Sequence, residues 1–505
     1  MSSITATNIK NGIMKKNKNK NNGLSRRKFI TNTAAVAAGI SIVPRHVLGG
    51  VGFTAPSDTL NIAGIGVGGM GRSNLKAMNS ERIVALCDVD WRYAQKTFTD
   101  YPDAKKFKDY RVMFDKMGDD IDAVVIATPD HTHAISAGES MTRGKHVYLQ
   151  KPLTHSIYES RYLTKLAEET GVATQMGNQG HSGDGTRLFA EWIQNGEIGD
   201  PLEAHCWTNR PIWPQGLERP ENKPEVPDTL DWDLFLGPAK YRPYNPAYTP
   251  WNWRAWWDFG TGALGDMGCH IIDPIYFALN LGHPTGFEGS SSQVNTESAP
   301  ISEKVSYYFP ENKKLGKVKF DPIKMTWYDG GLLPDRPEGI KPGKIMGDGG
   351  GGSMVVGTKG TIICSTYGRD PYIIGREDNP PKTEKIYPRV ETSHEMDWVR
   401  ACKEPKNSRK EASAHFGYSG PFNEVVVMGN LAVRLQDLKK RLDWDSEKME
   451  ITNIGANEEI KVVTSDSFTV VNGDPKFDTQ FETMNAKNAA EEYIKHTYRD
   501  GWELS

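Results

Sequence analysis

Between residues 60 and 180, short apolar runs alternate with stretches of helical periodicity. The stretch from 157 to 171 repeats apolar residues at helical spacing and ends in glycine, as a helix of about four turns would. Strands that alternate with helices predict a doubly wound parallel sheet of the Rossmann type. The apolar runs that we interpret as its strands begin at residues 60, 82, 123, 146 and 172.

Polar segments come directly after three of these runs, at residues 128–133, 150–151 and 178–181. Ligands of open parallel sheets bind at the carboxyl ends of the strands, so we expect these segments to surround one cleft. The fourth run delivers Lys151 and then stops at Pro152, because proline cannot donate to a sheet ladder. Lys151 is therefore a solvated loop residue, a phosphate contact or a catalytic group.

Beyond residue 181 the pattern changes to strand-like runs, followed by two late helices. This pattern predicts an α+β second domain with a mostly antiparallel sheet. The glycine cluster at 349–352 lacks the lysine and hydroxyl residue of a P-loop, and we interpret it as a hairpin or loop. We divide the chain into a leader at 1–48, a first domain at 58–180, a second domain at 181–445 and an extension at 446–505.

A glycine pattern, G-x-G-x-x-G, follows the first strand, and Asp88 ends the second strand about 20 residues later. The glycines permit a tight turn and close approach of the backbone to a pyrophosphate, which the next helix N-terminus favours. Asp88 would bond ribose hydroxyls and repel a 2′-phosphate, so the pattern favours NAD over NADP, although Arg92 weakens that preference. The contacts expected from this loop are Gly66, Gly68, Gly69, Met70, Gly71 and Arg72.

A second glycine-rich stretch, at 260–282, has helical periodicity and carries Asp266 and His270 four residues apart, on one face. A carboxylate beside an imidazole tunes its pKa and fixes its tautomer, as a general base requires. The structural alternative is a helix-start aspartate with a core histidine. A metal site of Asp266, His270 and His181 lacks a complete ligand set by spacing, so we expect no metal.

Seven of the 13 tryptophans lie between residues 207 and 257, among many prolines. We expect most of them to pack in the core or in an interface. A flat aromatic face also packs against the C–H face of a sugar, and the polar, proline-rich surroundings of Trp213 and Trp251 favour these two as ligand contacts. With His181 and Asp273, they are the substrate contacts that we predict.

Composition excludes several classes of protein. The chain has 505 residues, enough for two domains, and a formal net charge of −3 with interspersed signs, which implies no nucleic-acid-binding surface. Five scattered cysteines form neither a disulfide framework nor a C-x-x-C metal pair.

The N-terminal segment resembles a twin-arginine export signal. The sequence SRRKFI begins at Ser25 and leads into a weakly apolar run that ends near Val43. This run is short and rich in Ala, Gly and Thr for a transmembrane helix, although a chance arginine pair before an uncleaved anchor is the alternative. We expect export of the folded protein to the periplasm.

Five motifs in order, GIGVGGMGR, CDVD, ATPDHTHA, QKPLTH and GDMGCHIID, resemble the Gfo/Idh/MocA family of oxidoreductases over residues 58–440. The resemblance implies a Rossmann domain followed by an α/β domain whose large open sheet often forms oligomers. It also implies NAD(P) and chemistry at carbinol carbons of sugars and polyols. We therefore expect a sugar or glycoside substrate and a homo-oligomer, either a dimer or a tetramer.

The resemblance assigns roles to individual residues. Lys151 matches the lysine of the family's EKP motif, with Gln150 in place of the usual glutamate, and Asp266 and His270 match the catalytic pair of the second domain. The further cofactor contacts that we expect are Thr128, Pro129, His131, His133, Gln150, Lys151 and Gln179.

Two activities follow from the resemblance. The first is an NAD-dependent oxidoreductase for a sugar or glycoside, with the cofactor tightly bound because free NAD is scarce outside the cytoplasm. The alternative is an NAD-dependent glycosidase that oxidises its sugar transiently, eliminates the aglycone and restores the sugar by reduction.

Overall fold

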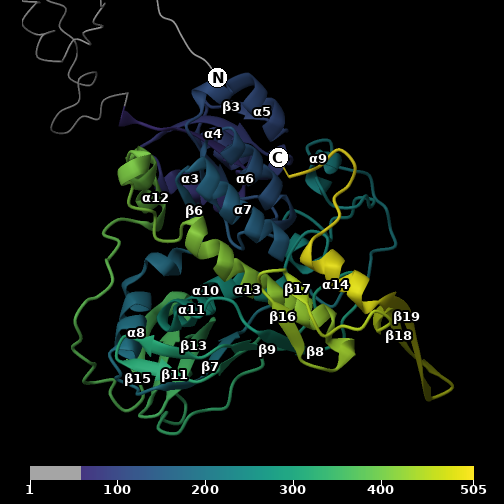
Figure 1. The fold of residues 1–505 in the computed structure, drawn as a ribbon. Helices are drawn as coiled ribbons and strands as arrows, with labels where there is room; N and C mark the ends of the chain where they lie inside the picture. Colours follow the sequence, from purple (N-terminus) through teal and green to yellow (C-terminus); the bar gives the residue numbers. More distant parts are fainter. Residues whose placement is uncertain (1–57, 505) are drawn as a thin grey trace, which may run out of the picture. The chain divides into compact units, whose positions relative to one another are not determined.

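The computed structural model describes residues 58–504, and its first sheet has six parallel strands in the order β3-β2-β1-β4-β5-β6 (Figure 1). The order reverses between β1 and β4, as in doubly wound folds, so the predicted parallel sheet is confirmed. Every residue of β4 is buried, which suits its Ala-Val-Val-Ile sequence. The strands are β1 (Asn61–Ile65), β2 (Arg82–Cys87), β3 (Lys105–Phe107), β4 (Ala123–Ile126), β5 (His146–Leu149) and β6 (Thr174–Met176).

Helices cover both faces of this sheet. The helix predicted at 157–171 is α7, which a capping box of Ser156 and Glu159 starts and Gly171, at φ +64°, ends. The helices that connect the strands are α3 (Gly69–Ala77), α4 (Trp91–Asp100), α5 (Tyr110–Met117), α6 (His133–Thr142) and α7 (Ile157–Thr170).

The second sheet has nine strands in the order β15-β14-β13-β7-β12-β9-β8-β16-β17. Only β7 and β12 pair in parallel, so the mostly antiparallel sheet predicted from the sequence is confirmed. Its strands are β7 (Pro201–Thr208), β8 (Gly286–Ser291), β9 (Glu303–Phe309), β12 (Ile323–Tyr328), β13 (Gly351–Gly357), β14 (Thr361–Ser365), β15 (Arg369–Ile373), β16 (Leu442–Asp445) and β17 (Glu450–Ile451). The glycine cluster at 349–352 thus leads into a central strand.

Two glycines allow the helices beside this sheet to pack closely. A Cβ on Gly268 of α10 would lie 3.1 Å from Val426 of α13, and a Cβ on Gly429 of α13 would overlap Leu264 of α10. Close packing of the two helices fixes the position of the face of α10 that carries Asp266 and His270. The helices are α8 (Asp184–Gln194), α10 (Gly262–Ile271), α11 (Asp273–Leu279) and α13 (Phe416–Arg434).

One late helix, α12 (His394–Lys403), returns to the first sheet. Its Trp398 is fully buried in the apolar cluster that contains Ile62 and Val125, and the indole Nε1 donates to Ala173 O (3.2 Å). This cluster also contains residues of α3 and α4, so α12 completes the layer that they form (Figure 1). Residues more than 200 positions beyond the first sheet therefore contribute to its core.

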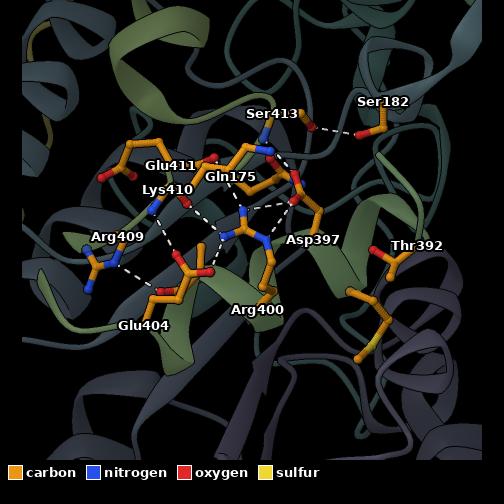
Figure 2. A network of polar contacts seen from close by, with 12 residues as sticks. Gln175, Ser182, Thr392, Asp397, Arg400, Glu404, Arg409, Lys410, Glu411 and Ser413 are labelled. Carbon is orange, nitrogen blue, oxygen red and sulfur yellow. Dashed lines mark hydrogen bonds and ion pairs between the residues drawn. The ribbon is translucent and has the colours of Figure 1, made fainter. Parts of the chain in front are cut away.

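A polar network fastens the segment after α12 to β6 (Figure 2). Arg400 donates to Asp397 Oδ1 (2.9 Å) and Glu404 Oε1 (2.7 Å), and Asp397 Oδ2 accepts from Ser413 N (2.7 Å). Gln175, fully buried on β6, donates to His394 O (2.6 Å) and accepts from Ala414 N (2.8 Å).

Gln175→Leu is expected to lower the free energy of unfolding by about 2–5 kcal/mol, because it leaves two buried backbone groups without partners. The measurement is a urea titration followed by tryptophan fluorescence. Gln480→Leu, on an exposed strand, is the matched control and should leave the urea midpoint nearly unchanged. Equal midpoints for Gln175→Leu and the wild type would contradict the role of this amide.

The remaining helices and strands lie outside the two main sheets. A two-stranded sheet of β18 (Glu459–Val471) and β19 (Asp474–Asn485) precedes α14 (Ala486–Ile494), in the predicted extension (Figure 1). The others are α9 (Trp232–Leu236), β10 (Asn312–Leu315) and β11 (Val318–Phe320). The twin-arginine motif lies outside the described residues, and none of the described helices has the length and apolarity needed to cross a bilayer. The domain ranges given above stay a prediction.

Candidate functional site

A cavity of about 920 Å³ is lined by residues of both sheets' domains. The glycine loop after β1 and the ends of β4 and β5 form one side of it. The second half of α10 and the tryptophan-rich segments near residues 213 and 251 form another. Thr128, Pro129, Gln150, Lys151 and Gln179 all lie on its wall, so the polar segments that follow the strands do meet around one cavity.

The glycine loop requires its glycines. Gly66 has φ +73°, and a Cβ there would lie 2.7 Å from the carbonyl carbon of Ala127. A Cβ on Gly71 would overlap Gly66 O, and one on Gly68 would overlap the ring of Tyr93. Tyr93, on the first turn of α4, lines the cavity beside the loop, and no motif in the sequence marks it.

Asp88 lies at the end of β2 and is almost fully buried. Its Oδ2 accepts from Val67 N (2.9 Å) and Gly68 N (3.2 Å), and its Oδ1 accepts from Asp90 N (2.9 Å). Burial raises the pKa of Asp88 to about 6, although these backbone donors oppose the shift. The carboxylate therefore holds the glycine loop and also faces the cavity.

Lys151 extends from the end of β5 to α10. Its ammonium group donates to Asp266 Oδ1 (2.7 Å) and to Asp266 O (2.9 Å), and the two side chains are only 13% and 15% exposed. Arg254 donates from Nε to the same Oδ1 (3.1 Å). Burial opposes ionisation of Asp266, but the charges of Lys151 and Arg254 outweigh it and hold its pKa well below the usual range. Arg254 was not predicted, because it lies in a short 3-10 helix, η6 (Asn252–Ala255), that carries no motif.

His270 is one turn further along α10 and lines the cavity. Its Nδ1 is buried without a hydrogen-bond partner, which leaves Nε2 as the nitrogen open to the cavity. Burial lowers the pKa of His270 to about 3, and the Lys151 charge lowers it further while Asp266 opposes this. Within residues 58–504 no hydrogen bond joins Asp266 to His270. The expectation that Asp266 orients the imidazole is thus wrong, since two stronger cationic donors occupy the carboxylate.

Gln150 does not contact the Lys151 ammonium. Its Nε2 donates to Asn74 Oδ1 (2.9 Å), and Asn74 in turn donates to Glu395 Oε1 (3.1 Å) on α12. A Cβ on Gly177 would lie 2.5 Å from the Gln150 amide nitrogen, so a close backbone holds this side chain. Gln150 lines the cavity as a neutral group, and Asp266 supplies the carboxylate partner of Lys151.

Four of the predicted cofactor contacts lie away from the cavity wall, and one of them, Gly71, packs against Gly66 O of the loop itself. Arg72 points to Asp100 on α4 and forms an ion pair with it (2.6 Å). The rings of His131 and His133 are buried between backbone carbonyls: the His131 nitrogens lie 2.9 Å from Phe235 O and 3.3 Å from Phe259 O. The His133 nitrogens lie 2.8 Å and 2.9 Å from the carbonyls of residues 152 and 128. Burial lowers the pKa of each histidine to about 4. These two rings join loops around the site, and the motif spacing could not reveal their orientation.

His181 and Asp273 are also not on the wall, contrary to the prediction of substrate contact. Both are almost fully buried, and His181 Nδ1 lies 3.0 Å from the Asp273 carboxylate. Tyr418 stacks on His181 at 4.2 Å and donates to Asp273 Oδ1 (2.6 Å). This trio connects α11 to α13 and η5 (Gln179–Ser182). Among the described residues, no group of three or more His, Cys, Asp or Glu could hold a metal ion.

Three tryptophans line the cavity: Trp213 and Trp251, which were predicted as ligand contacts, and Trp253, which was not. Five of the seven between 207 and 257 are buried, whereas Trp213 and Trp251 line the cavity and Trp251 is 51% exposed. The Arg254 guanidinium lies 4.0 Å from the Trp251 ring and 4.2 Å from the Trp253 ring, which also lines the cavity. Trp251 and Trp253 therefore hold the cation that contacts Asp266.

The residues around the glycine loop fit a dinucleotide. The loop backbone approaches the cavity without intervening Cβ atoms at Gly66, Gly68 and Gly69, and a buried carboxylate, Asp88, lies beside it. Thr128 Oγ1, on the same wall, is buried and has no hydrogen-bond partner.

Comparison with known proteins supports this interpretation. Residues 60–178 match the oxidoreductase-family NAD-binding Rossmann fold of the Gfo/Idh/MocA type, and residues 192–315 match the C-terminal α/β domain of the same family. The chain is 30% identical to an inositol 2-dehydrogenase of Burkholderia multivorans over 155 residues, which is 29% of this chain and 45% of that protein. It is 27% identical to a glycosyl hydrolase family 109 protein of Shewanella pealeana over 209 residues, 36% of this chain and 45% of that protein. The chain thus spans about half the length of these curated relatives.

Among solved structures, the WlbA dehydrogenase from Bordetella pertussis, in complex with NADH and UDP-GlcNAcA, superposes with a TM-score of 0.52. The superposition covers 77% of this chain and 99% of WlbA at 14% sequence identity, which shows a shared fold. The two family models match separate parts of the chain, residues 60–178 and 192–315, and the solved structure shows that the chain shares this two-domain fold.

Proposed function

We propose that this protein is an NAD-dependent oxidoreductase that acts on a carbinol carbon of a sugar or glycoside and keeps its cofactor tightly bound. The observation that carries the proposal is one cavity shared by the glycine loop, the Lys151–Asp266 ion pair and His270. Similarity to an inositol 2-dehydrogenase over part of the chain supports a polyol-like substrate.

The glycine loop, Asp88, Thr128 and Gln150 would hold the nucleotide. When bound, the nicotinamide supplies an acceptor for hydride from the carbinol carbon. Asp88 favours NAD over NADP because its carboxylate would repel a 2′-phosphate. Arg72 is engaged by Asp100, which makes it unavailable as a partner for such a phosphate.

Side chains of the protein would carry out the proton transfer. Burial lowers the pKa of His270, so its imidazole is neutral near pH 7 and Nε2 can accept the hydrogen bond, and then the proton, of a substrate hydroxyl that Lys151 polarises. An ammonium group has three donors, and Lys151 uses two of them on Asp266. Within the described residues the third donor has no acceptor, so it can stabilise the same substrate oxygen as negative charge develops on it. Asp266 and Arg254 position Lys151.

The affinity for NAD is expected to fall as the pH drops through about 6. Ribose hydroxyls donate to ionised Asp88, whose pKa burial raises to about 6, so protonation below that pH removes an acceptor. The dissociation constant, measured by fluorescence titration of nucleotide-stripped protein between pH 5 and pH 8, should rise up to about tenfold per pH unit below the pKa. Asp88→Asn should bind weakly at every pH, and an unchanged pH dependence in that variant would assign the effect to another group.

The direct test is a screen of glycosides and free sugars against the purified protein. Denaturation should release NAD, and incubation with a substrate should give a keto-sugar with persistent absorbance of reduced nicotinamide. Protein that releases no nucleotide would contradict tight binding, and protein that oxidises no sugar even with added NAD would contradict the proposed activity.

A second candidate is the redox-neutral glycosidase, which the similarity to a glycosyl hydrolase family 109 protein favours. Both activities need the same bound cofactor and the same base. Aryl glycosides separate them: aglycone release without net reduction of the nicotinamide would indicate the glycosidase.

We also propose export to the periplasm through the N-terminal twin-arginine motif, and a homo-oligomeric state. Replacing Arg26 and Arg27 by lysine should retain the protein in the cytoplasm, and light scattering would measure the oligomer. A periplasmic product from the double-lysine variant would contradict this route.

A further inference from the structure

The part of the cavity around Lys151 and His270 is rich in positive charge. The cavity as a whole is lined by five lysine or arginine residues and three aspartates: Lys108, Lys151, Arg210, Arg254 and Arg369, and Asp88, Asp90 and Asp266. Lys151 and Arg254 share Asp266 as their partner, so this carboxylate cannot also neutralise the other two arginines.

Arg369 lies close to the candidate base. Its Nε donates to Thr366 O (3.2 Å), and its guanidinium lies 5.0 Å from the ring of Tyr367. The same ring lies 4.5 Å from the His270 imidazole. One edge of the guanidinium is thus anchored by a backbone carbonyl, while its terminal nitrogens have no carboxylate partner within residues 58–504.

Arg210 approaches from the end of β7. Its guanidinium donates to Asn209 Oδ1, and no carboxylate in the described chain forms an ion pair with it. The neighbouring Asn209 N donates to Gly350 O (3.2 Å), next to the turn that holds Thr366. The acid of that turn, Asp348, is already engaged, since its Oδ1 accepts from Gly350 N, Gly351 N and Thr366 Oγ1.

The aspartates beside the glycine loop do not neutralise Arg210 and Arg369. Asp88 accepts three backbone N–H groups, and Asp90 caps α4 through the amides of residues 92 and 93. A cleft with an excess of one sign of charge concentrates ligands of the opposite sign, and guanidinium groups bind carboxylates and other oxyanions with paired hydrogen bonds.

We propose that the substrate is an acidic sugar and that Arg210 and Arg369 bind its anionic group, a carboxylate or a sulfate ester. This inference rests on the proposed sugar oxidoreductase function. It narrows the substrate class by charge, and it makes the two arginines specificity-determining residues.

The test measures binding by isothermal titration calorimetry on the NAD-loaded protein. Methyl glycosides of glucuronic, galacturonic and mannuronic acid are each compared with the neutral glycoside of the same configuration and with its sulfate ester. We expect the acidic member of at least one set to bind about 10–100-fold more tightly, the range of charged hydrogen bonds. The carboxylate and sulfate arms identify which anion the arginines prefer.

Arg369→Gln and Arg210→Gln should each weaken the acidic ligand about tenfold or more and leave the neutral ligand unchanged. Arg143→Gln, at an exposed arginine paired with Glu139 on α6, is the matched control and should alter the affinity for neither ligand.

Equal affinities for the acidic and neutral members of every set of glycosides would overturn the inference. Equal losses of affinity for acidic and neutral ligands in the two arginine variants would overturn it as well. Neutral sugars that are oxidised as well as acidic ones would overturn this inference alone. Acidic sugars that bind tightly without any being oxidised would overturn the proposed activity instead.

Discussion

Lys151→Met should lower kcat/KM for sugar oxidation by about 1,000-fold, within the range of 10²–10⁴ for lost proton-transfer partners. The substitution removes the donor available to the substrate oxygen and leaves the Asp266 carboxylate with Arg254 as its remaining cation. Steady-state kinetics with the preferred sugar measures the loss. It should fall mainly on kcat, because the donor acts most strongly on the charge that develops in the transition state.

Two further variants separate chemistry from folding. Lys165→Met, at a lysine of α7 that is 75% exposed, should keep the wild-type rate. If both groups act on one hydroxyl, His270→Ala should lower kcat/KM as much as Lys151→Met does. The double variant should then have a kcat/KM only slightly below that of either single variant. Substantial turnover in Lys151→Met, with nucleotide still bound, would show that this lysine is solvated or structural and not catalytic.

Gly71→Ala should reduce NAD affinity by more than about 100-fold, with a stability loss of about 1–3 kcal/mol, as overpacked sites show. A Cβ at Gly71 would overlap Gly66 O, a backbone atom of the same loop that cannot rotate away. The start of α3 and the loop must therefore separate, which displaces the N–H groups that would face the pyrophosphate. Nucleotide titration and thermal unfolding give the two values.

Gly118→Ala is the matched control for this steric argument. Gly118 has helical backbone angles, and a Cβ there would meet nothing within 4 Å. Alanine at such a position reduces the entropy of the unfolded chain, so stability should be equal or slightly higher. Wild-type NAD affinity in Gly71→Ala would show that the loop can absorb a methyl group.

Local patterns in the sequence were sufficient for the element order. The apolar runs of β1, β4 and β5 and the helical periodicity of α7 depend on neighbouring residues only, because a fully buried strand needs continuous apolar sequence. The glycine spacing and the four-residue interval between Asp266 and His270 are likewise local. These features located the loop, the Rossmann domain and the helix face that lines the cavity.

Longer-range contacts could not be predicted in this way. Lys151 meets Asp266 across 115 positions, and Gln175 bonds residues more than 200 positions away. Arg254 joins the site only because two tryptophans hold it beside Asp266. Histidines 131 and 133 belong to a motif, yet both rings turn toward backbone carbonyls instead of the cavity.

The sequence by itself therefore determined the two sheets, the glycine loop with Asp88, and the candidate residues Lys151, Asp266 and His270. Only the tertiary structure decided that Asp266 binds Lys151 and Arg254 and not His270, and that α12 completes the first domain. The physical reason is that periodicity and spacing fix which side of an element a side chain occupies. The partner that it meets there depends on how α10 packs against α13 and how distant loops close over the strand ends.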